Sequence, residues 1–366
     1  MRTLGALWCM LALAATSAPA GEAAGVQLKQ ADDALEITLD GKPFTTYLFA
    51  PRPSMNQRIL RPCFYPVFGP NQVPMMRNYP LAEGDPKETK PDHPHHTSLW
   101  VAYGAVNGVD NWSNAPKAGW QLHKSFEAVE SGAEAGMFRE TLDWTDAEKK
   151  PILAEVRTVR IPRPKDDTYR LLDLELTLQA KYGTVLFGDT KEGGMCSTRM
   201  RTELRADKDG KNGRLVNSNG EAGNASWGRR ALWVDASGEV EGKRYGYAIF
   251  DHPSNLRHKM AGQPDGVYWH SRTYGLLGSN PFAIQSFDKK NPEKGTYTLD
   301  EGKELTLRYR VLFHLGDEKE GKVAERWEEY AKANGSVGSR PADRLAPSAS
   351  PSEACRLPLR LGLGNE

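Results

Sequence analysis

Apolar and polar residues alternate along several stretches of the chain. Residues 35–39, 172–178 and 305–311 have an apolar side chain at every second position and mostly polar ones between. Because successive side chains of a strand point to opposite faces, this period predicts antiparallel strands with one apolar and one solvated face. The dipeptide Asp40-Gly41 separates the first stretch from a second apolar-rich stretch, which predicts a hairpin.

One helix is predicted near the C-terminal end. Val323, Trp327 and Tyr330 recur at helical spacing, and Gly335 marks a stop. The rest of the chain shows no alternation of strands with helical spacers, which argues against a parallel sheet. Gly and Pro are spread throughout as turn residues. We therefore expect an all-β, mostly antiparallel fold with a short C-terminal helix.

The two ends of the chain differ in composition from its middle. Residues 1–20 begin with one basic residue, continue with a short apolar run and finish with Ala18-Pro19-Ala20, which predicts a secretory signal peptide. The alternative for this segment is a buried N-terminal helix. Residues 26–335 are predicted to form one domain, and residues 336–366, rich in Pro, Ser and Arg, a disordered tail. We expect an exported protein, periplasmic or extracellular, with no membrane span after the signal.

Charge and cysteine content narrow the class of protein. The net charge of +1 gives no electrostatic case for nucleic-acid binding. Without Cys9 of the predicted signal, the chain keeps Cys63, Cys196 and Cys355, whose wide spacing fits neither a disulfide scaffold nor a zinc cluster. The sequence does not decide whether Cys63 and Cys196 form a disulfide in an oxidising compartment. It does not decide the oligomeric state either.

Three of the eight histidines lie within residues 93–96, directly after Asp92. On an extended segment His93 and His95 would share one face and His96 would point to the other, and a pair of this kind could hold a divalent metal. Histidines could equally act as general acids or bases. The plain alternative is that they hydrogen-bond a loop together. Residues 99–103 read as a buried strand, so the histidines are expected where a loop enters the core, at the rim of a pocket.

A second polar stretch is expected to form the opposite wall of this pocket. Asp251 and His252 follow a predicted buried strand, and Trp269-His270-Ser271-Arg272 lies further along. Arg272 could bind a carboxylate or a sugar oxygen, or form a structural salt bridge. The candidate catalytic residues are His95, His96, His252, His270 and Arg272; the candidate substrate contacts are Arg77, Asn78, Trp100, Asp110, Trp112, Asp251, Trp269 and Tyr274; the candidate metal ligands are His93 and His95.

A set of short motifs gives the chain a resemblance to a known family. The motifs are Arg61-Pro62, Tyr65-Pro66-Val67, Arg77-Asn78-Tyr79-Pro80, Asp92-His93-Pro94-His95-His96, Ser98-Leu99-Trp100, Asn107-Gly108-Val109-Asp110, Asp251-His252-Pro253, Trp269-His270, Tyr274-Gly275 and Asn280-Pro281-Phe282. Together they resemble secreted bacterial proteins labelled "methane oxygenase PmoA", over roughly residues 26–334. Lys259 stands where similar sequences often have proline.

The resemblance implies a large β-sandwich, similar to the supersandwich of galactose mutarotases, and a carbohydrate-related role. Methane oxidation is the least favoured implication, because the membrane subunit of that name has several transmembrane helices. Two main hypotheses follow. The first is an enzyme acting on sugars or sugar acids, with a small-molecule or oligosaccharide ligand, through histidine acid–base or metal-assisted chemistry. The second is a non-catalytic carbohydrate-binding or scaffold protein with Trp100, Trp112 and Trp269 as platforms. Clustered titratable groups favour the enzyme, and a metal-dependent oxygenase comes third.

Overall fold

The computed structural model describes residues 24–54, 57–83, 88, 92–256 and 265–332. The predicted signal peptide, residues 1–20, and the predicted tail, residues 336–366, lie outside the described residues and stay predictions.

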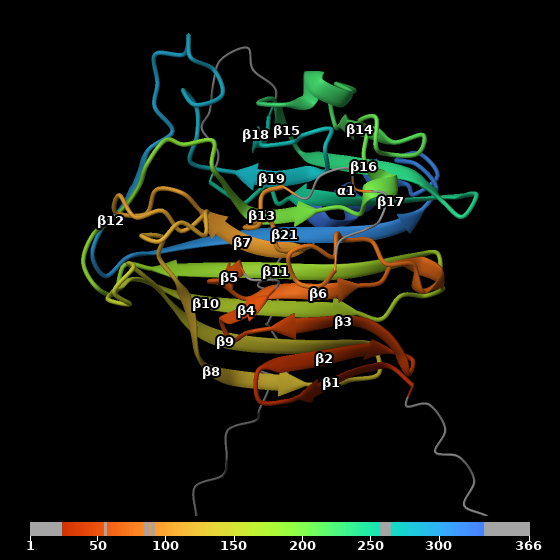
Figure 1. Cartoon of the computed structure of the whole chain (residues 1–366), viewed down its shortest axis with the longest axis horizontal. Coiled ribbons are helices and arrows are strands. Elements are labelled where there is room, and N and C mark those ends of the chain that lie inside the picture. The colour runs from red at the N-terminus through yellow and green to blue at the C-terminus, as the bar shows by residue number, and fades with distance from the viewer. Residues whose placement is uncertain (1–23, 55–56, 84–87, 89–91, 257–264, 333–366) are drawn as a thin grey trace, which may run out of the picture.

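Two large antiparallel sheets form the molecule, and Figure 1 shows their strands running across it. The nine-stranded sheet has, in spatial order, β1 (Val26–Gln30), β2 (Ala34–Leu39), β3 (Lys42–Leu48), β6 (Cys63–Val67), β7 (Leu99–Tyr103), β13 (Gly193–Arg199), β19 (Leu276–Asn280), β18 (Val267–Trp269) and β15 (Arg230–Ala231). The eight-stranded sheet has β14 (Arg214–Asn217), β16 (Trp233–Val240), β17 (Lys243–Asp251), β21 (Glu304–Leu315), β11 (Tyr169–Gln179), β10 (Pro151–Pro162), β9 (Ala135–Thr145) and β8 (Gln121–Glu130).

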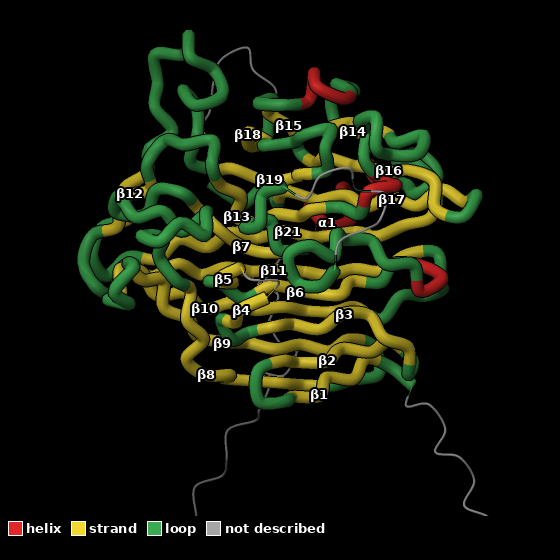
Figure 2. Tube along the Cα trace, viewed as in Figure 1, coloured by secondary structure: helices red, strands yellow, loops and turns green. Residues whose placement is uncertain are grey.

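Two short ribbons, one α-helix and three 3₁₀ helices complete the described structure; the 3₁₀ helices are η1 (Pro70–Gln72), η2 (Thr202–Leu204) and η3 (Gly223–Ser226). The ribbons pair β4 (Arg52–Ser54) with β5 (Gln57–Ile59), and β12 (Val185–Phe187) with β20 (Tyr297–Leu299). The α-helix is α1 (Val323–Lys332). Figure 2 shows that strands and loops account for nearly all of the described chain. The all-β, mostly antiparallel fold class predicted from the sequence is therefore confirmed.

The predicted hairpin is present between β2 and β3. Asp40 has φ 49° and Gly41 φ 77°, and Leu39 pairs with Lys42. Two successive residues with positive φ match the twist of the flanking strands, and the Asp-Gly sequence tolerates this conformation.

The core of the sandwich lies between the two sheets. Phe44 of the nine-stranded sheet meets Phe313 of the eight-stranded sheet with ring centroids 6.1 Å apart. Strand β7 shows how alternation divides its side chains, because Leu99 and Val101 belong to this inter-sheet core. Trp100 packs in a separate cluster on the outer face of the nine-stranded sheet. The sandwich thus leaves that outer face for other side chains.

The outer face of β11 is less exposed to solvent than its sequence predicts. Asp173 and Glu175 are each only 4% exposed. They lie opposite Arg310 and Arg308 of β21 and accept hydrogen bonds from them, at 2.5 Å to Arg310 Nε and 2.8 Å to Arg308 Nε. Cross-strand ion pairs therefore occupy positions that alternation alone assigns to solvent.

Helix α1 forms where the sequence predicts a helix. Its buried residues Val323 and Tyr330 pack with Phe250 and Leu312 on the outer face of the eight-stranded sheet. Over the described part of the chain, no helix combines the length and apolar character that crossing a membrane requires.

The two cysteines of the sandwich are not bonded to each other. Cys63 and Cys196 are both free and buried. Cys196 belongs to the inter-sheet core and Cys63 to the outer cluster, so the sheet itself separates them.

The edges of the two sheets meet at the end of the molecule where β1 and β8 lie (Figure 1). The backbone N–H of Val26 donates to the carbonyl of Gly132 at 2.8 Å, and the N–H of Gly132 donates back to Val26 at 3.0 Å. The N–H of Leu28 donates to Ser131 Oγ at 2.9 Å. Edge strand β1 is thus bonded to the turn that joins β8 and β9.

Replacing one leucine of this core should reveal the energetic weight of the inter-sheet packing. Leu174 of β11 has no exposed surface. Leu174→Ala should lower the free energy of unfolding by about 2–5 kcal/mol, through lost transfer energy and a cavity. Leu186→Ala is the matched control, because Leu186 is 45% exposed, and it should change the free energy by less than about 0.5 kcal/mol. Urea denaturation measures both; equal losses would contradict the assigned core.

Candidate functional site

The three clustered histidines lie in a tight turn, residues 92–96, which we call the histidine turn. The backbone N–H of His96 donates to the carbonyl of His93 at 2.9 Å, and His93 has φ 46°. The chain therefore folds back instead of extending, and the ring of His93 stacks on that of His96 at 4.7 Å between centroids. The expectation that His93 and His96 point to opposite faces is wrong, because it assumed an extended backbone.

Two buried arginines hold the histidine turn against the nine-stranded sheet. Arg199 at the end of β13 donates from Nη2 to Asp92 Oδ1 at 2.7 Å, and its Nη1 lies 3.2 Å from His96 Nδ1. Arg77 donates from Nη1 to Asp92 Oδ1 at 3.0 Å, and from Nη2 to the carbonyls of Asp92 at 2.9 Å and His93 at 3.1 Å. Arg77 also pairs with Glu88 at 3.0 Å. Arg77, predicted to contact substrate, thus positions the turn instead.

The aromatic residues near the turn form its packed support. The rings of Trp100 and Trp112 lie 5.4 and 5.5 Å from that of His96. Trp100 is 1% exposed and Trp112 is 2% exposed. Trp269 faces the inter-sheet core, where its indole donates to the carbonyl of Ala231 at 2.9 Å. This burial contradicts the predicted role of the three tryptophans as open platforms for a sugar.

Part of the second predicted wall does reach the histidine turn. The ring of His270, which directly follows β18, stacks with that of Trp112 at 6.4 Å. Tyr274 stacks on His93 at 5.3 Å with an interplanar angle of 9°. Arg272 lies over the ring of Trp227 at 4.5 Å. No carboxylate among the described residues is within ion-pair distance of Arg272, so the salt bridge considered for it has no described partner.

The other part of that wall lies elsewhere. Asp251 ends β17 in the eight-stranded sheet, and its carbonyl accepts from Trp327 Nε1 of α1 at 3.0 Å. The ring of His252 lies 5.0 Å from that of Tyr330, also in α1. The structure therefore does not bring Asp251 or His252 together with the histidine turn, because strand β17 belongs to the opposite sheet.

Two further predicted contacts have visible local roles. Asp110 Oδ1 accepts from the backbone N–H groups of Trp112 at 2.8 Å and Ser113 at 2.9 Å, so it closes the turn that presents Trp112. Asn78 is exposed, and its Oδ1 accepts from the Tyr65 hydroxyl at 3.1 Å. Asn78 remains available to a ligand, whereas Asp110 is committed to the backbone.

The charge states of the histidines follow from burial and neighbouring guanidiniums. Burial, and then the charge of Arg61, lowers the pKa of His95 to about 3. Burial, and then Arg272, lowers the pKa of His270 to about 3. Burial lowers the pKa of His96 well below its usual range. All three imidazoles are therefore neutral at neutral pH. Burial acts to raise the pKa of Asp92, but the His93 hydrogen bond and the Arg199 charge outweigh it and hold that carboxyl ionised.

The predicted metal ligands do not form a complete coordination set. Over the described residues, no group of three or more His, Cys, Asp or Glu side chains is arranged to hold a metal ion. The rings of His93 and His95 lie 5.8 Å apart and meet edge to face, and His93 Nδ1 lies 2.8 Å from Asp92 Oδ2. A metal at His93 and His95 stays a prediction.

Sequence reasoning assigned no role to two arginines of the site, Arg199 and Arg61. Arg199 and Arg61 are each 1% exposed. Arg61 donates from Nη2 to the carbonyl of Ser113 at 2.7 Å, and no carboxylate among the described residues is within ion-pair distance of it. Burial lowers the pKa of Arg61 to about 10, which leaves it cationic at neutral pH. The available signal was an arginine inside the apolar run from Ile59 to Phe64.

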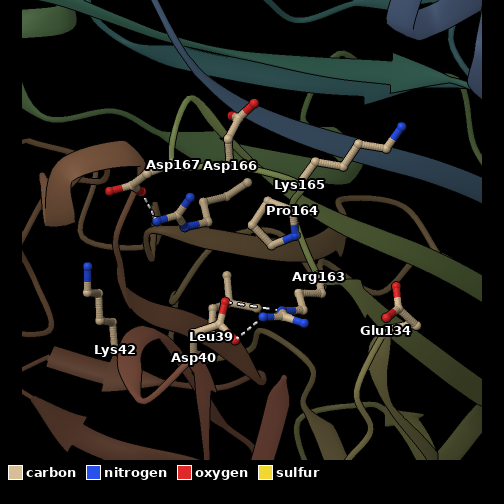
Figure 3. A pocket seen from close by; sticks show the side chains of 10 residues that line it. Leu39, Asp40, Lys42, Glu134, Arg163, Pro164, Lys165, Asp166 and Asp167 are labelled. Carbon is tan, nitrogen blue, oxygen red and sulfur yellow. Dashed lines mark hydrogen bonds and ion pairs between the residues drawn. The ribbon is translucent and has the colours of Figure 1, made fainter. Parts of the chain in front are cut away.

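A hollow elsewhere on the molecule is less suited to a ligand. A pocket of about 370 Å³ lies beside Arg163 (Figure 3). Arg163 is paired with Asp40 at 2.9 Å, and Arg170 with Asp167. Because these charges already neutralise each other, the histidine turn and its neighbours are the stronger candidate site.

The low pKa values of two histidines predict how stability depends on pH. Unfolded, His95 and His270 take up a proton near pH 6.5, but in the fold only near pH 3. Between these values the unfolded state binds more protons, so the free energy of unfolding rises with pH by up to about 1.4 kcal/mol per pH unit for each histidine. His270→Gln should make this slope shallower in denaturation measured across that window. An unchanged slope would mean that His270 is protonated in the folded state across this pH window, as it is in the unfolded state.

Two solved structures show a distant likeness to this chain. A galactose mutarotase related enzyme from Lactobacillus acidophilus matches with 9% sequence identity and a TM-score of 0.31, over 79% of this chain and 97% of the other. The galactosidase domain of an alpha-galactosidase-sucrose kinase matches with 10% identity and a TM-score of 0.37, over 80% of this chain and 42% of the other. At these TM-scores the likenesses carry no argument about function.

Sequence comparison gives a family but no activity. No curated protein matches the chain. The model of DUF6807, a family of unknown function, matches residues 34–328. This span includes the histidine turn, both anchoring arginines and His270. The resemblance to proteins labelled methane oxygenase PmoA stays a prediction, whereas the family match covers most of the chain. The chain belongs to the DUF6807 family of unknown function.

Proposed function

We propose that the protein is an exported enzyme that acts on an acidic carbohydrate by proton transfer, with His95 as the general base. The observation that supports this most is the position of His95. Its ring is half-buried and uncharged at neutral pH, and Arg61 donates to its backbone carbonyl at 3.5 Å. A neutral imidazole in a field of buried cations can accept a proton while the surroundings attract an anion.

The arginines favour an anionic substrate over a neutral one. Arg61 and Arg272 have no carboxylate partner among the described residues, whereas Arg77 and Arg199 share Asp92. A buried cation without a counter-charge is costly, and a ligand carboxylate near it would offset that cost. Sugar acids supply such a group together with hydroxyls for the exposed side chain of Asn78.

Exposure divides the histidines into a reacting group and supporting groups. The side chain of His93 is 39% exposed, and that of Asp92 is 38% exposed, so the histidine turn is partly open to solvent. His96 and His270 are only 1% and 3% exposed. A general base must come within hydrogen-bond reach of the proton it removes, which His95 can do and the two buried rings cannot. The buried rings instead pack beneath the reacting position.

Substrate binding would strengthen the base. Burial, and then the charge of Arg61, lowers the pKa of His95. A bound carboxylate screens that charge and favours the imidazolium, so the pKa of His95 in the complex moves back toward its ordinary range. His95 would then be a more effective base in the complex than in the free enzyme, because a pKa near the working pH is best for proton transfer.

Removing the proposed base should abolish turnover while leaving binding largely intact. His95→Gln should lower kcat by about 10² or more, because the amide cannot accept the proton, and should change the ligand Kd little. The assay is ¹H NMR in D₂O with galacturonate, glucuronate and mannuronate and their oligomers, which detects both proton exchange and bond cleavage. His252→Gln, on the opposite sheet, is the matched control and should keep full activity. Equal turnover in wild type and His95→Gln would overturn the proposal.

The two kinetic parameters should differ in their response to acid. The free enzyme needs neutral His95, so kcat/KM should stay level as the pH falls toward the pKa of about 3. In the complex the substrate carboxylate raises that pKa, so kcat should fall at a higher pH than kcat/KM does. Initial rates over a pH series measure both curves. Acid limbs at the same pH would contradict an anionic substrate beside His95.

A further inference from the structure

A second pocket lies beside the histidine site and has an aromatic lining. Its volume is about 350 Å³, and Trp227, Tyr268 and Phe287 line it together with the polar residues Asn224, Arg229, Arg230 and Asp288. The rings of Tyr268 and Phe287 stack at 5.6 Å, and Trp227 meets Phe287 at 5.6 Å with an interplanar angle of 70°. Trp227 and Phe287 are only half-buried. The pocket therefore presents aromatic surface that the fold does not cover.

One loop, residues 272–274, joins this pocket to the histidine turn. Tyr274 stacks on His93. Thr273 Oγ1 donates to Asn224 Oδ1 at 3.2 Å, and Arg272 lies over Trp227 at 4.5 Å. A ligand that crosses this short loop would thus touch both places.

A second connection runs through the residues below the loop. The ring of Phe287 lies 6.1 Å from that of His270, which itself stacks with Trp112 of the histidine site. The hydroxyl oxygens of Ser226 and Ser271 are 3.0 Å apart. The two sites therefore share a packed boundary, and their separation is set by the fold.

Two polar atoms lack a hydrogen-bond partner here, one in the lining of the pocket and one beside it. The indole nitrogen of Trp227 is buried and has no hydrogen-bond partner, although buried polar groups are normally satisfied. Arg272 Nε is likewise buried without a partner. An oxygen-rich ligand with a negative charge would satisfy both groups, whereas an apolar ligand would satisfy neither.

We propose that this aromatic pocket, lined by Trp227, Phe287 and Asn224, is a second sugar-binding subsite, and that the ligand is an acidic oligosaccharide spanning residues 272–274. This inference rests on the proposed function. An aromatic ring offers an apolar face to the C–H groups of a sugar, Asn224 and Arg229 offer hydrogen bonds to hydroxyls, and Arg272 offers a charge to a carboxylate. The pockets beside Arg163 and Lys243 have no Trp, Tyr or Phe in their lining.

Chain-length dependence of binding tests the subsite. Calorimetry would measure Kd for the monomer, dimer and trimer of galacturonate, glucuronate and mannuronate. In the wild type the trimer of the accepted sugar should bind more tightly than its monomer, and the gain is the ratio of the monomer Kd to the trimer Kd. Trp227→Ala should reduce this ratio by about tenfold. It should leave the monomer Kd unchanged, because the monomer occupies only the histidine site. Trp120→Ala is the matched control, because an arginine, Arg58, also lies over the ring of Trp120 at 4.9 Å. This control variant should keep the wild-type gain.

A second variant guards against a folding defect. Asn224 and Arg229 line the pocket and are exposed, so the double variant Asn224→Ala/Arg229→Ala should keep the wild-type Tm and still lose part of the gain. Equal Kd values for monomer and trimer in the wild type would overturn the subsite and leave the proposed function standing. An unchanged gain in both pocket variants would also overturn the subsite and leave the proposed function standing. Failure of the wild type to bind any of these sugars would overturn the proposed function and the subsite together.

Discussion

The pairing of two buried arginines with Asp92 is the interaction on which the candidate site depends. A guanidinium in a sheet interface is stable only if its charge and donors are matched, and the ionised Asp92 and the carbonyls of the histidine turn match those of Arg77 and Arg199. The same contacts fix the turn, so the geometry of the histidines follows from the solvation needs of the arginines. Loss of Asp92 would thus affect the position of all three rings at once.

The sandwich supplies the rest of the arrangement through simple alternation. In strand β7, Leu99 and Val101 point into the core and Trp100 points to the outer face. The histidine turn covers Trp100 there. Tight packing on both faces of the same sheet makes the floor of the site rigid, as protein interiors generally are. At the rim, His95 and the loop at residues 272–274 are partly exposed to solvent.

The local features of the fold could be read from the sequence, and the partnerships between distant residues could not. Period-two alternation, the Asp40-Gly41 hairpin and the helix around Tyr330 depend on neighbours in the chain, so their signals are local. The sequence also places His270 in a wall opposite the histidine turn, and in the structure the rings of His96 and His270 both lie beside that of Trp112. The pairing of Arg199 with Asp92 depends on strand order, which no local pattern encodes. Asp251 and His252 were placed in the wrong wall because a position after a buried strand does not reveal which sheet that strand joins.

The bonded edge formed by Val26 and Gly132 has a consequence for behaviour at high concentration. An exposed edge strand offers unpaired backbone groups to another molecule and so invites intermolecular strand addition and aggregation. In this protein the N–H and carbonyl groups of Val26 are taken by Gly132, and the N–H of Leu28 is taken by Ser131. The first residues of β1 are thereby protected against acting as a template for fibril growth.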